Sequence, residues 1–326
     1  MTRAYNSFTR LAHGILEFRR PGAGTGPRVT VVGGVHGNER IGVRVLDALR
    51  LALLQLTPSP LTTSTTLAPG AVVTLVYANE QALRIGKRGS TPHADLNRCF
   101  TTEILTASSS SSTYEENRAR ELAAIFAKTD VLVDLHSTNK PSEPFIRIAG
   151  HAHGLSTDMQ RLAARLPCQI LLRDPRFLLA DGRVALTDEY VGSCGGLGIC
   201  YESGVATDLS TEKVESITQS LWTMLVEDMR AIESPEMSTT DNSSVRHFEH
   251  VYEITQVFKL TERGFRWADG VGTTNFQCVP AGKPIGFVGE NEPFVVNYDA
   301  HIVFPKVPEL WKIGAPLGWL TKKISS

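Results

Sequence analysis

Short apolar runs rich in β-branched residues alternate with stretches of helical periodicity over the first three-quarters of the chain, and this alternation constrains the fold most. The run Val29–Val32 ends at a Gly-Gly pair, and the segment Asn38–Leu56 then carries apolar residues three and four positions apart, until Pro58. This pattern predicts a strand, a tight turn and a helix. Further strand-like runs are found at residues 71–78, 131–135, 169–172 and 198–201.

Two more helices are predicted among these strands. Thr113 and Glu116 have the spacing of a capping box, so a helix is expected to begin there. Residues 211–232 form a long amphipathic stretch. Near-continuous apolar strands separated by helices are typical of a sheet that is covered on both faces. The sequence therefore predicts an α/β fold with a mostly parallel or mixed central sheet flanked by helices.

The pattern changes after a polar segment, residues 234–245, which we predict to be a linker. Beyond it, two strand-like runs at 251–260 and 294–304 are separated by glycine-rich turns. Residues 246–326 are therefore expected to form a small all-β C-terminal domain. Residues 1–233 are expected to form the larger α/β domain that precedes the linker.

The charge of the chain is balanced. Lys and Arg number 33 against 34 Asp and Glu, which gives a formal net charge of −1. Such a chain has no global field that attracts a polyanion, so nucleic acid is not expected as a partner. No run approaches the ~18 apolar residues that are needed to span a bilayer, so no membrane partner is expected either.

The five cysteines are widely spaced and include no Cys-x-x-Cys pair. This favours reduced thiols and a cytoplasmic location over a disulfide framework or a cysteine zinc site. The N-terminus lacks the apolar core of a secretory signal. It does contain Arg3 and Arg10 with no acidic residue before Glu17, so an organellar location is the alternative.

Two histidine motifs lie at the ends of predicted strands. The motif GGVHGNE supplies His36 and Glu39, and the motif DLH supplies Asp134 and His136. The carboxyl ends of parallel strands meet at one edge of a sheet, where ligands bind. Two His and one Glu suit a catalytic zinc site with an open fourth position. Asp134 fits either a hydrogen-bond partner of His136 or a structural acid, and His36 with Glu39 alone also fits ordinary residues at a helix N-terminus.

Two further motifs carry charged groups. Asn97 and Arg98, preceded by Arg88, offer an amide and a planar guanidinium fork that can bind a carboxylate together. Glu202 follows a short apolar strand and can transfer protons beside a metal-bound water. Each motif also has a simpler explanation, because Asn-Arg pairs are common on solvated surfaces and acids are common at strand ends.

In chain order, these four motifs resemble those of the aspartoacylase and succinylglutamate desuccinylase family of zinc-dependent amide hydrolases, which shares its catalytic fold with the zinc carboxypeptidases. The matching motifs are GGVHGNE with His36 and Glu39, DLNR with Asn97 and Arg98, DLH with His136, and YESG with Glu202. The resemblance spans nearly the whole chain, because that family also has a small β-rich C-terminal domain. It implies that the chain cleaves the amide bond of a small, carboxylate-bearing N-acyl amino acid.

The resemblance also implies a cofactor. One Zn²⁺ per chain, held by His36, Glu39 and His136, would activate a water molecule and polarise the amide carbonyl. Glu202 would take the proton of this water as a general base and deliver it to the leaving amine as a general acid.

Four more residues receive roles from the same resemblance. Arg88 matches an arginine that stabilises the developing oxyanion. Asn97 and Arg98 match residues that bind a substrate carboxylate. Tyr298, in the β-rich segment, is a candidate for a hydroxyl that closes the pocket.

The sequence departs from the family pattern in two places. The segment Gly89–Pro92 lengthens the interval between Arg88 and the Asn-Arg pair. The stretch Val191–Tyr201 contains no basic residue, whereas the aspartoacylase branch has an arginine there that binds a second substrate carboxylate. A strict preference for N-acetylaspartate is therefore not expected. Three arginines farther away are candidates for supplying the charge: Arg173, Arg176 and Arg183.

Two other functions stay open at this point. The metal set and the Asn-Arg anchor also resemble the zinc carboxypeptidases, which act on the C-terminal residues of peptides, although the β-rich segment favours a deacylase. A non-catalytic binding protein on the same fold would be expected to have lost a metal ligand or Glu202, and none of these is lost. The sequence does not indicate the oligomeric state, and a homo-oligomer is compatible with it.

Overall fold

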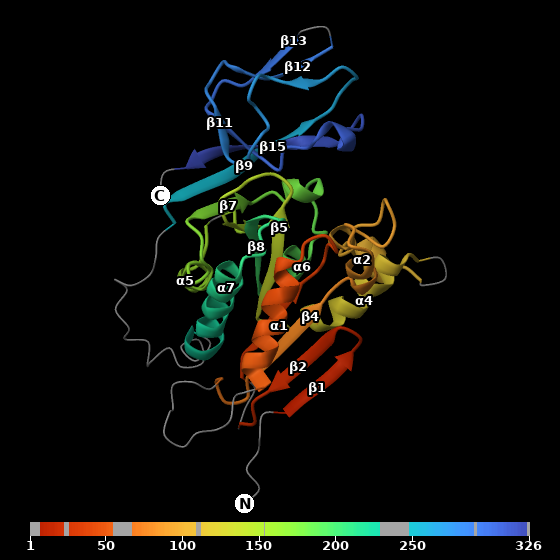
Figure 1. Ribbon diagram of the computed structural model, residues 1–326, viewed down its shortest axis with the longest axis vertical. Coiled ribbons are helices and arrows are strands. Elements are labelled where there is room, and N and C mark those ends of the chain that lie inside the picture. The colour runs from red at the N-terminus through yellow and green to blue at the C-terminus, as the bar shows by residue number, and fades with distance from the viewer. Residues whose placement is uncertain are drawn as a thin grey trace, which may run out of the picture.

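The computed structural model describes residues 7–22, 26–54, 67–108, 112–152, 154–228, 248–289 and 292–324. A twelve-stranded mixed sheet runs through the molecule (Figure 1), in the order β1 (Ser7–Ala12), β2 (Ile15–Arg19), β4 (Val72–Tyr77), β3 (Arg28–Gly33), β5 (Val131–Thr138), β8 (Leu197–Val205), β6 (Phe145–Ala149), β7 (Ile170–Asp174), β9 (His250–Lys259), β15 (Pro316–Ile324), β14 (Ala300–Val303) and β11 (Gln277–Val279). Within the described ranges, no helix has both the length and the apolar character needed to cross a membrane.

The centre of this sheet is parallel and buried. β4, β3, β5 and β8 are parallel neighbours, and all eight residues of β5 are buried. Successive side chains of a strand point to opposite faces, so a run that is apolar at every position needs a cover on both sides. These four strands coincide with apolar runs in the sequence, and the predicted α/β fold is confirmed.

Antiparallel strands extend this centre at two places that the sequence patterns did not predict. The hairpin of β1 and β2 pairs with β4 at one edge, and β6 pairs antiparallel with β8. Arg147 interrupts the apolar run of β6, which hides the strand from a hydropathy pattern. The structure buries this arginine completely because three carboxylates surround it: those of Asp174, Asp188 and Glu189.

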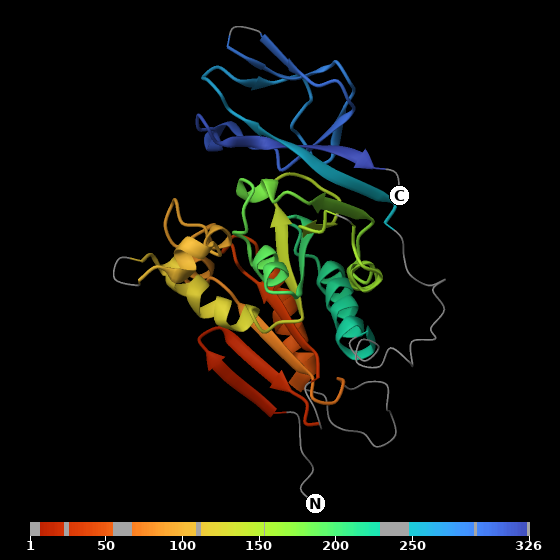
Figure 2. The same ribbon diagram turned by 180° about the vertical axis from the view of Figure 1, so that it is seen from behind.

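Helices cover the two faces of the sheet (Figures 1 and 2). α1 (Ile41–Leu54) and α7 (Thr211–Thr223) lie side by side on one face, and α4 (Tyr114–Phe126) and α6 (Thr187–Ser193) lie on the other. The predicted capping box at Thr113 is present, since the Thr113 N–H donates to Glu116 Oε2 at 2.8 Å and the Glu116 N–H donates to Thr113 Oγ1 at 3.3 Å. A π-helical turn (Met224–Asp228) continues α7, and residues 229–232 of the predicted helix lie outside the described residues.

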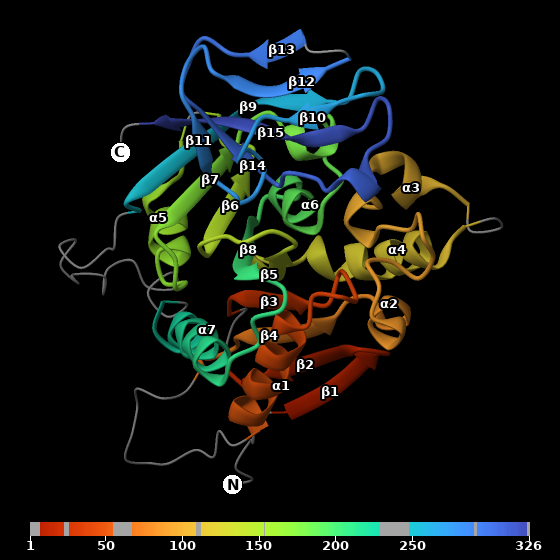
Figure 3. The same cartoon turned by 45° about the horizontal axis from the view of Figure 1, so that its top comes forward.

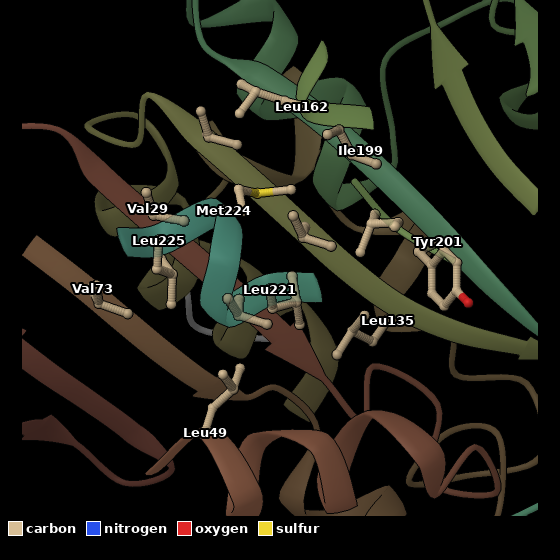
Figure 4. Packing of buried hydrophobic residues seen from close by; sticks show 14 of the residues in the cluster. Val29, Leu49, Val73, Leu135, Leu162, Ile199, Tyr201, Leu221, Met224 and Leu225 are labelled. Atoms are coloured by element: carbon tan, nitrogen blue, oxygen red, sulfur yellow. The ribbon is translucent and has the colours of Figure 1, made fainter. Parts of the chain in front are cut away.

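The larger core lies between the sheet and the first of these helix pairs. Figure 4 shows Leu49 of α1 and Leu221 of α7 directed toward Val73, Leu135 and other residues of the strands. Burying a leucine or valine side chain completely contributes roughly 1.5–3 kcal/mol, so this interface stabilises the packing of the two helices on the strands.

The C-terminal segment is all-β, as predicted, and part of it continues the large sheet. β9 pairs in parallel with β7, and β15, β14 and β11 follow it with antiparallel pairing. A separate three-stranded sheet consists of β10 (Arg266–Trp267), β12 (Pro284–Val288) and β13 (Glu292–Val295). The run 294–304 therefore contains two strands of different sheets, β13 and β14. The predicted linker 234–245 lies outside the described residues, and the division into two domains stays a prediction.

The C-terminal strands lie above the carboxyl ends of the central strands (Figures 1 and 3). Hydrogen bonds outside the pairing of β7 with β9 also join the two parts. The Trp319 indole N–H on β15 donates to the carbonyl oxygen of Leu178 at 2.9 Å, and the Asn275 N–H donates to the carbonyl oxygen of Pro141 at 2.9 Å. The C-terminal strands can therefore contribute side chains to the sheet edge at which His36 and His136 lie.

Candidate metal centre and substrate pocket

The loop after β3 turns sharply and brings His36 and Glu39 to the same side. Gly34 has a positive φ of 71°, a conformation that is easily adopted only by glycine. Gly37 packs so closely on α2 (Glu80–Ile85) that an added Cβ would lie 2.0 Å from the carbonyl oxygen of Ala82. The Glu39 N–H donates to the His36 carbonyl oxygen at 3.1 Å and closes the turn. The two glycines explain why this loop can place both side chains on one centre.

His36, Glu39 and His136 form one buried cluster. Glu39 Oε1 lies 2.8 Å from His36 Nδ1, and Glu39 Oε2 lies 3.0 Å from His136 Nδ1. One ligand atom from each residue lies within 4.8 Å of the others, and no other such group occurs among the described residues. The carboxylate is also fixed by the Ser137 N–H, which donates to Oε2 at 3.0 Å. The three residues predicted as metal ligands are therefore brought together.

The electrostatics of this cluster favour a cation. Burial raises the pKa of the Glu39 carboxyl, but His36 and His136 outweigh burial and hold this pKa well below its ordinary value. Burial lowers the pKa of His136, but Asp134 and Glu39 reverse this effect and raise it well above the ordinary value. Two imidazoles and one carboxylate also match the donor set of catalytic zinc sites. The residues present thus fit a divalent zinc ion.

A carboxylate lies behind each histidine. Asp95 Oδ1 is 3.1 Å from His36 Nε2, and Asp134 Oδ2 is 2.9 Å from His136 Nε2. In both imidazole rings Nε2 contacts an aspartate carboxylate, and Nδ1 faces Glu39. Such carboxylate partners orient a metal-binding imidazole and increase its basicity. Of the two roles open for Asp134, the structure supports the hydrogen-bond partner. Asp95 was not predicted for this role, because 59 residues separate it from His36.

Arg88 reaches the cluster through Asp95. Its Nε and Nη2 donate to Asp95 Oδ2 at 3.1 and 2.9 Å, and its Nη1 lies 4.0 Å from Glu39 Oε1. The extra residues after Arg88 are anchored, since the N–H and hydroxyl of Ser90 both donate to the buried Glu115 carboxylate. The lengthened segment therefore does not remove Arg88 from the site.

Asn97 and Arg98 belong to a short 3-10 helix, η1 (Leu96–Arg98), which Asp95 caps. Asn97 Oδ1 accepts a hydrogen bond from the Thr187 N–H at 3.0 Å, while its Nδ2 lies 3.4 Å from His136 Nε2. The Thr187 hydroxyl donates to Asp134 Oδ2. Arg98 Nη1 donates to the carbonyl oxygen of Asn97 at 2.5 Å. Thr187, at the start of α6, was missed because a helix of seven residues shows no clear periodicity.

Glu202 lies beside the cluster on β8. It is in register with His136 of the neighbouring strand β5, and it is 7% exposed. No described residue forms a hydrogen bond with its Oε2. Burial is the main cause that raises the pKa of Glu202 to about 8. A buried carboxyl with a free oxygen and a raised pKa is suited to accept and return a proton near neutral pH.

These residues share one pocket, which encloses about 550 Å³ including its opening to solvent. Seven of the predicted residues line it: His36, Glu39, Arg88, Asn97, Arg98, His136 and Glu202. The C-terminal strands supply part of the opposite wall through Phe304, Lys306 and Trp319. No sequence motif marks these three residues, and their role could not be predicted.

Tyr298 is not among the residues that line the pocket. Its hydroxyl forms a 2.8 Å hydrogen bond with Thr255 Oγ1, and the Lys322 Nζ lies 4.2 Å from the centroid of its ring. The side chain is held within the C-terminal strands, so the structure does not support the prediction that its hydroxyl closes the pocket.

Two of the three arginines predicted as candidates for a second anion anchor contact other groups. Arg173 Nη1 lies 3.5 Å from Glu253 Oε2, and Arg176 Nη2 donates to the carbonyl oxygen of Thr255 at 2.6 Å. Neither of them lines the pocket, and Arg183 does not line it either.

Comparison with known proteins connects this site to one family. Residues 25–226 match a family model described as the succinylglutamate desuccinylase/aspartoacylase catalytic domain. A curated protein named probable aspartoacylase, from a Nostoc species, is 36% identical over 116 residues, which are 34% of this chain and 35% of that protein. The match thus spans about a third of the length of this relative.

Solved structures show the same fold over nearly the whole chain. Succinylglutamate desuccinylase from Chromobacterium violaceum aligns with a TM-score of 0.69 at 19% identity, covering 97% of this chain and 90% of its own. Murine aminoacylase 3 aligns with a TM-score of 0.65 at 17% identity, covering 93% of this chain and 97% of its own. Both alignments extend beyond the residues of the family match.

Proposed function

The chain belongs to the succinylglutamate desuccinylase/aspartoacylase family, and we propose that it is a zinc-dependent hydrolase that cleaves the amide bond of N-acyl amino acids. The observation that carries the proposal is the buried His36–Glu39–His136 cluster, with a partnerless carboxylate oxygen of Glu202 in the same pocket. The names of the similar proteins, an aspartoacylase, a desuccinylase and an aminoacylase, all describe deacylases and support the same reaction class.

His36 Nδ1, His136 Nδ1 and the Glu39 carboxylate would hold one zinc ion per chain. When bound, zinc polarises a carbonyl group and lowers the pKa of a water ligand. Three protein ligands leave a coordination position open for that water or the substrate. Asp95 and Asp134 keep both imidazoles turned toward the centre.

Glu202 is the proton-transfer group in this proposal. Because its pKa is raised to about 8, its carboxylate can accept a proton from water and then donate it to the amine that leaves. Its position opposite His136 on the neighbouring strand places it beside the proposed metal ligands. Arg88 lies at the same centre and stabilises negative charge on the oxygen of the attacked amide, a contribution of several kcal/mol in comparable sites.

Asn97 and Arg98 bind the carboxylate of the amino-acid part of the substrate. The Thr187 N–H occupies Asn97 Oδ1, so the Asn97 Nδ2, which lies 3.4 Å from His136 Nε2, is the group that can donate to the carboxylate. A guanidinium and an amide donor together recognise a carboxylate by charge and by direction. The substrate class that follows is a small N-acyl amino acid with a free carboxylate.

Metal analysis and substrate hydrolysis test this proposal together. We expect the purified protein to contain about one zinc per chain, and to hydrolyse N-acetyl or N-succinyl amino acids faster than it releases C-terminal residues from peptides. Glu202→Gln should abolish turnover while it retains the metal. Glu215→Gln, an exposed acid on α7, is the matched control and should behave like the wild type.

Four results would contradict the proposal. Metal content far below one per chain would remove the proposed cofactor. Equal turnover by Glu202→Gln would remove the proposed proton-transfer group. Faster cleavage of peptides than of acylated amino acids would identify a carboxypeptidase, and metal binding without any turnover would identify a binding protein on this fold.

A further inference from the structure

The segment between β7 and α6, residues 175–186, forms part of the pocket wall. It contributes the side chains of Leu179 and Leu186 to the pocket. The carbonyl oxygen of Leu178 accepts a hydrogen bond from the indole N–H of Trp319 at 2.9 Å, and Trp319 lines the same pocket. A shift of this segment therefore changes the surface that a substrate contacts.

The backbone of this segment is strained at two positions. Phe177 and Asp181 have φ values of 55° and 53°, which lie in the left-handed region that residues other than glycine rarely adopt. Such conformations persist only where the surrounding structure holds them. The shape of the segment therefore depends on the contacts that fix its two ends.

Two carboxylates hold the segment by its main chain. Asp174, at the end of β7, accepts two N–H groups near the start of the segment, and Glu189, on α6, accepts two at its end. The donors, with their distances, are the N–H groups of Leu178 (2.7 Å), Leu179 (3.0 Å), Ala185 (3.0 Å) and Leu186 (3.2 Å). Both leucines that line the pocket are thus fixed by a carboxylate.

Arg147 joins these two carboxylates. Its side chain on β6 is completely buried, and its Nη1 lies 2.9 Å from Glu189 Oε1 and 3.3 Å from Asp174 Oδ2. Its Nη2 donates to both oxygens of Asp188, at 3.1 and 2.8 Å. One planar guanidinium therefore fixes the end of β7 and the start of α6 relative to each other. Arg147 itself does not line the pocket.

We propose that Arg147 is a positioning residue for substrate binding. By joining Asp174 to Glu189, it holds residues 175–186 in the shape that places Leu179 and Leu186 in the pocket wall. The inference rests on the proposed function for the identity of the substrate. It extends that function to a residue that touches neither the substrate nor the proposed metal ligands.

Arg147→Lys tests this role, because an ammonium keeps the charge but lacks the planar fork that reaches three carboxylates. We expect KM for the N-acyl amino acid that the wild type hydrolyses fastest to rise about 10-fold, because contacts with the pocket wall are weakened. The kcat per zinc-loaded chain should change less than about 3-fold, because the proposed metal ligands and Glu202 are not displaced. Asp174→Asn, which removes one carboxylate from the guanidinium, is the second variant and should also raise KM.

A purely structural role predicts a different result. Destabilisation lowers the fraction of folded enzyme, so it lowers the apparent kcat and leaves KM unchanged. Arg173→Lys is the matched control, because Arg173 precedes Asp174 on β7, pairs with Glu253 and does not line the pocket. It should keep the KM of the wild type. The inference is wrong if Arg147→Lys and Asp174→Asn both keep this KM, or if Arg173→Lys raises it equally.

Hydrogen exchange separates this inference from the proposed function. If the wild type hydrolyses no N-acyl amino acid, the proposed function fails, but exchange measured by mass spectrometry still tests Arg147. Peptides covering residues 175–187 should exchange about 10-fold faster in Arg147→Lys, while peptides of β3 and β5 keep the wild-type rate. Unchanged exchange at 175–187, or equal acceleration of all peptides, overturns the inference.

Discussion

Thr187 holds Asn97 in place across 90 residues of sequence, through a 3.0 Å hydrogen bond from its backbone N–H to Asn97 Oδ1. The hydroxyl of the same threonine donates to Asp134, which in turn holds the His136 ring. The first residue of α6 therefore orients a proposed substrate-binding amide and a proposed metal ligand at once. The proposed substrate binding and the proposed metal binding therefore both depend on Thr187.

Removing only the Thr187 hydroxyl should lower the affinity for zinc more than it lowers the stability of the fold. Thr187→Val keeps the N–H that orients Asn97, but it leaves Asp134 Oδ2 without this donor. We expect zinc affinity to fall about 10- to 100-fold, as for comparable partners of metal-binding histidines. Competition with a chelator of known affinity measures this change. Thr187→Ser retains the hydroxyl and should bind zinc like the wild type, and equal affinities of the Val and Ser variants would contradict the role of the hydroxyl.

Arg147 and the acids around it should dominate the stability of the region that carries α6. Its Nη1 lies 2.9 Å from Glu189 and 3.3 Å from Asp174, and its Nη2 lies 2.8 Å from Asp188. All four side chains are essentially inaccessible to solvent. Arg147→Met leaves three carboxylates without their cation, so the free energy of unfolding should fall by about 3–5 kcal/mol. Urea denaturation followed by circular dichroism measures the loss.

Arg173→Met is the control for this prediction. Arg173 lies on the neighbouring strand β7 and forms one ion pair with Glu253, in which both side chains retain some exposure. Its removal should cost about 0–1 kcal/mol. Similar losses for the two variants would show that the buried network contributes no more than an ordinary surface pair.

The sequence predicted the parts of the site that follow strand ends. His36 follows β3, His136 lies near the end of β5 and Glu202 lies in β8, and the parallel pairing of these strands brings the three residues together. Apolar runs locate such strands well, because a strand covered on both faces must be apolar at every position. The family motifs then distinguish these residues from ordinary polar groups at a sheet edge.

The remaining contacts depend on tertiary packing. Asp95 meets His36 because of how a loop folds, and Thr187 meets Asn97 because of how α6 packs on β8. Lys306 reaches the pocket only because β9 joins the C-terminal strands to β7. None of these pairings leaves a periodic pattern along the chain. The three arginines predicted as candidates for a second anion anchor do not line the pocket, whereas Lys306 does.

Gly37 should be required for metal binding although it offers no ligand. In Gly37→Ala the new Cβ would lie 2.0 Å from the carbonyl oxygen of Ala82, so the loop has to move away from α2. Because His36 and Glu39 flank this position, we expect zinc content well below one per chain, together with a loss of about 1–3 kcal/mol of stability from overpacking. Metal analysis and thermal denaturation of the purified variant test both parts.

Gly192→Ala offers a matched substitution, because Gly192 is an exposed glycine of α6 with open space around its Cα. It should retain zinc and gain about 0.4–1 kcal/mol from the lower entropy of the unfolded chain. Full zinc content in Gly37→Ala would show that the loop can move without displacing its two ligands.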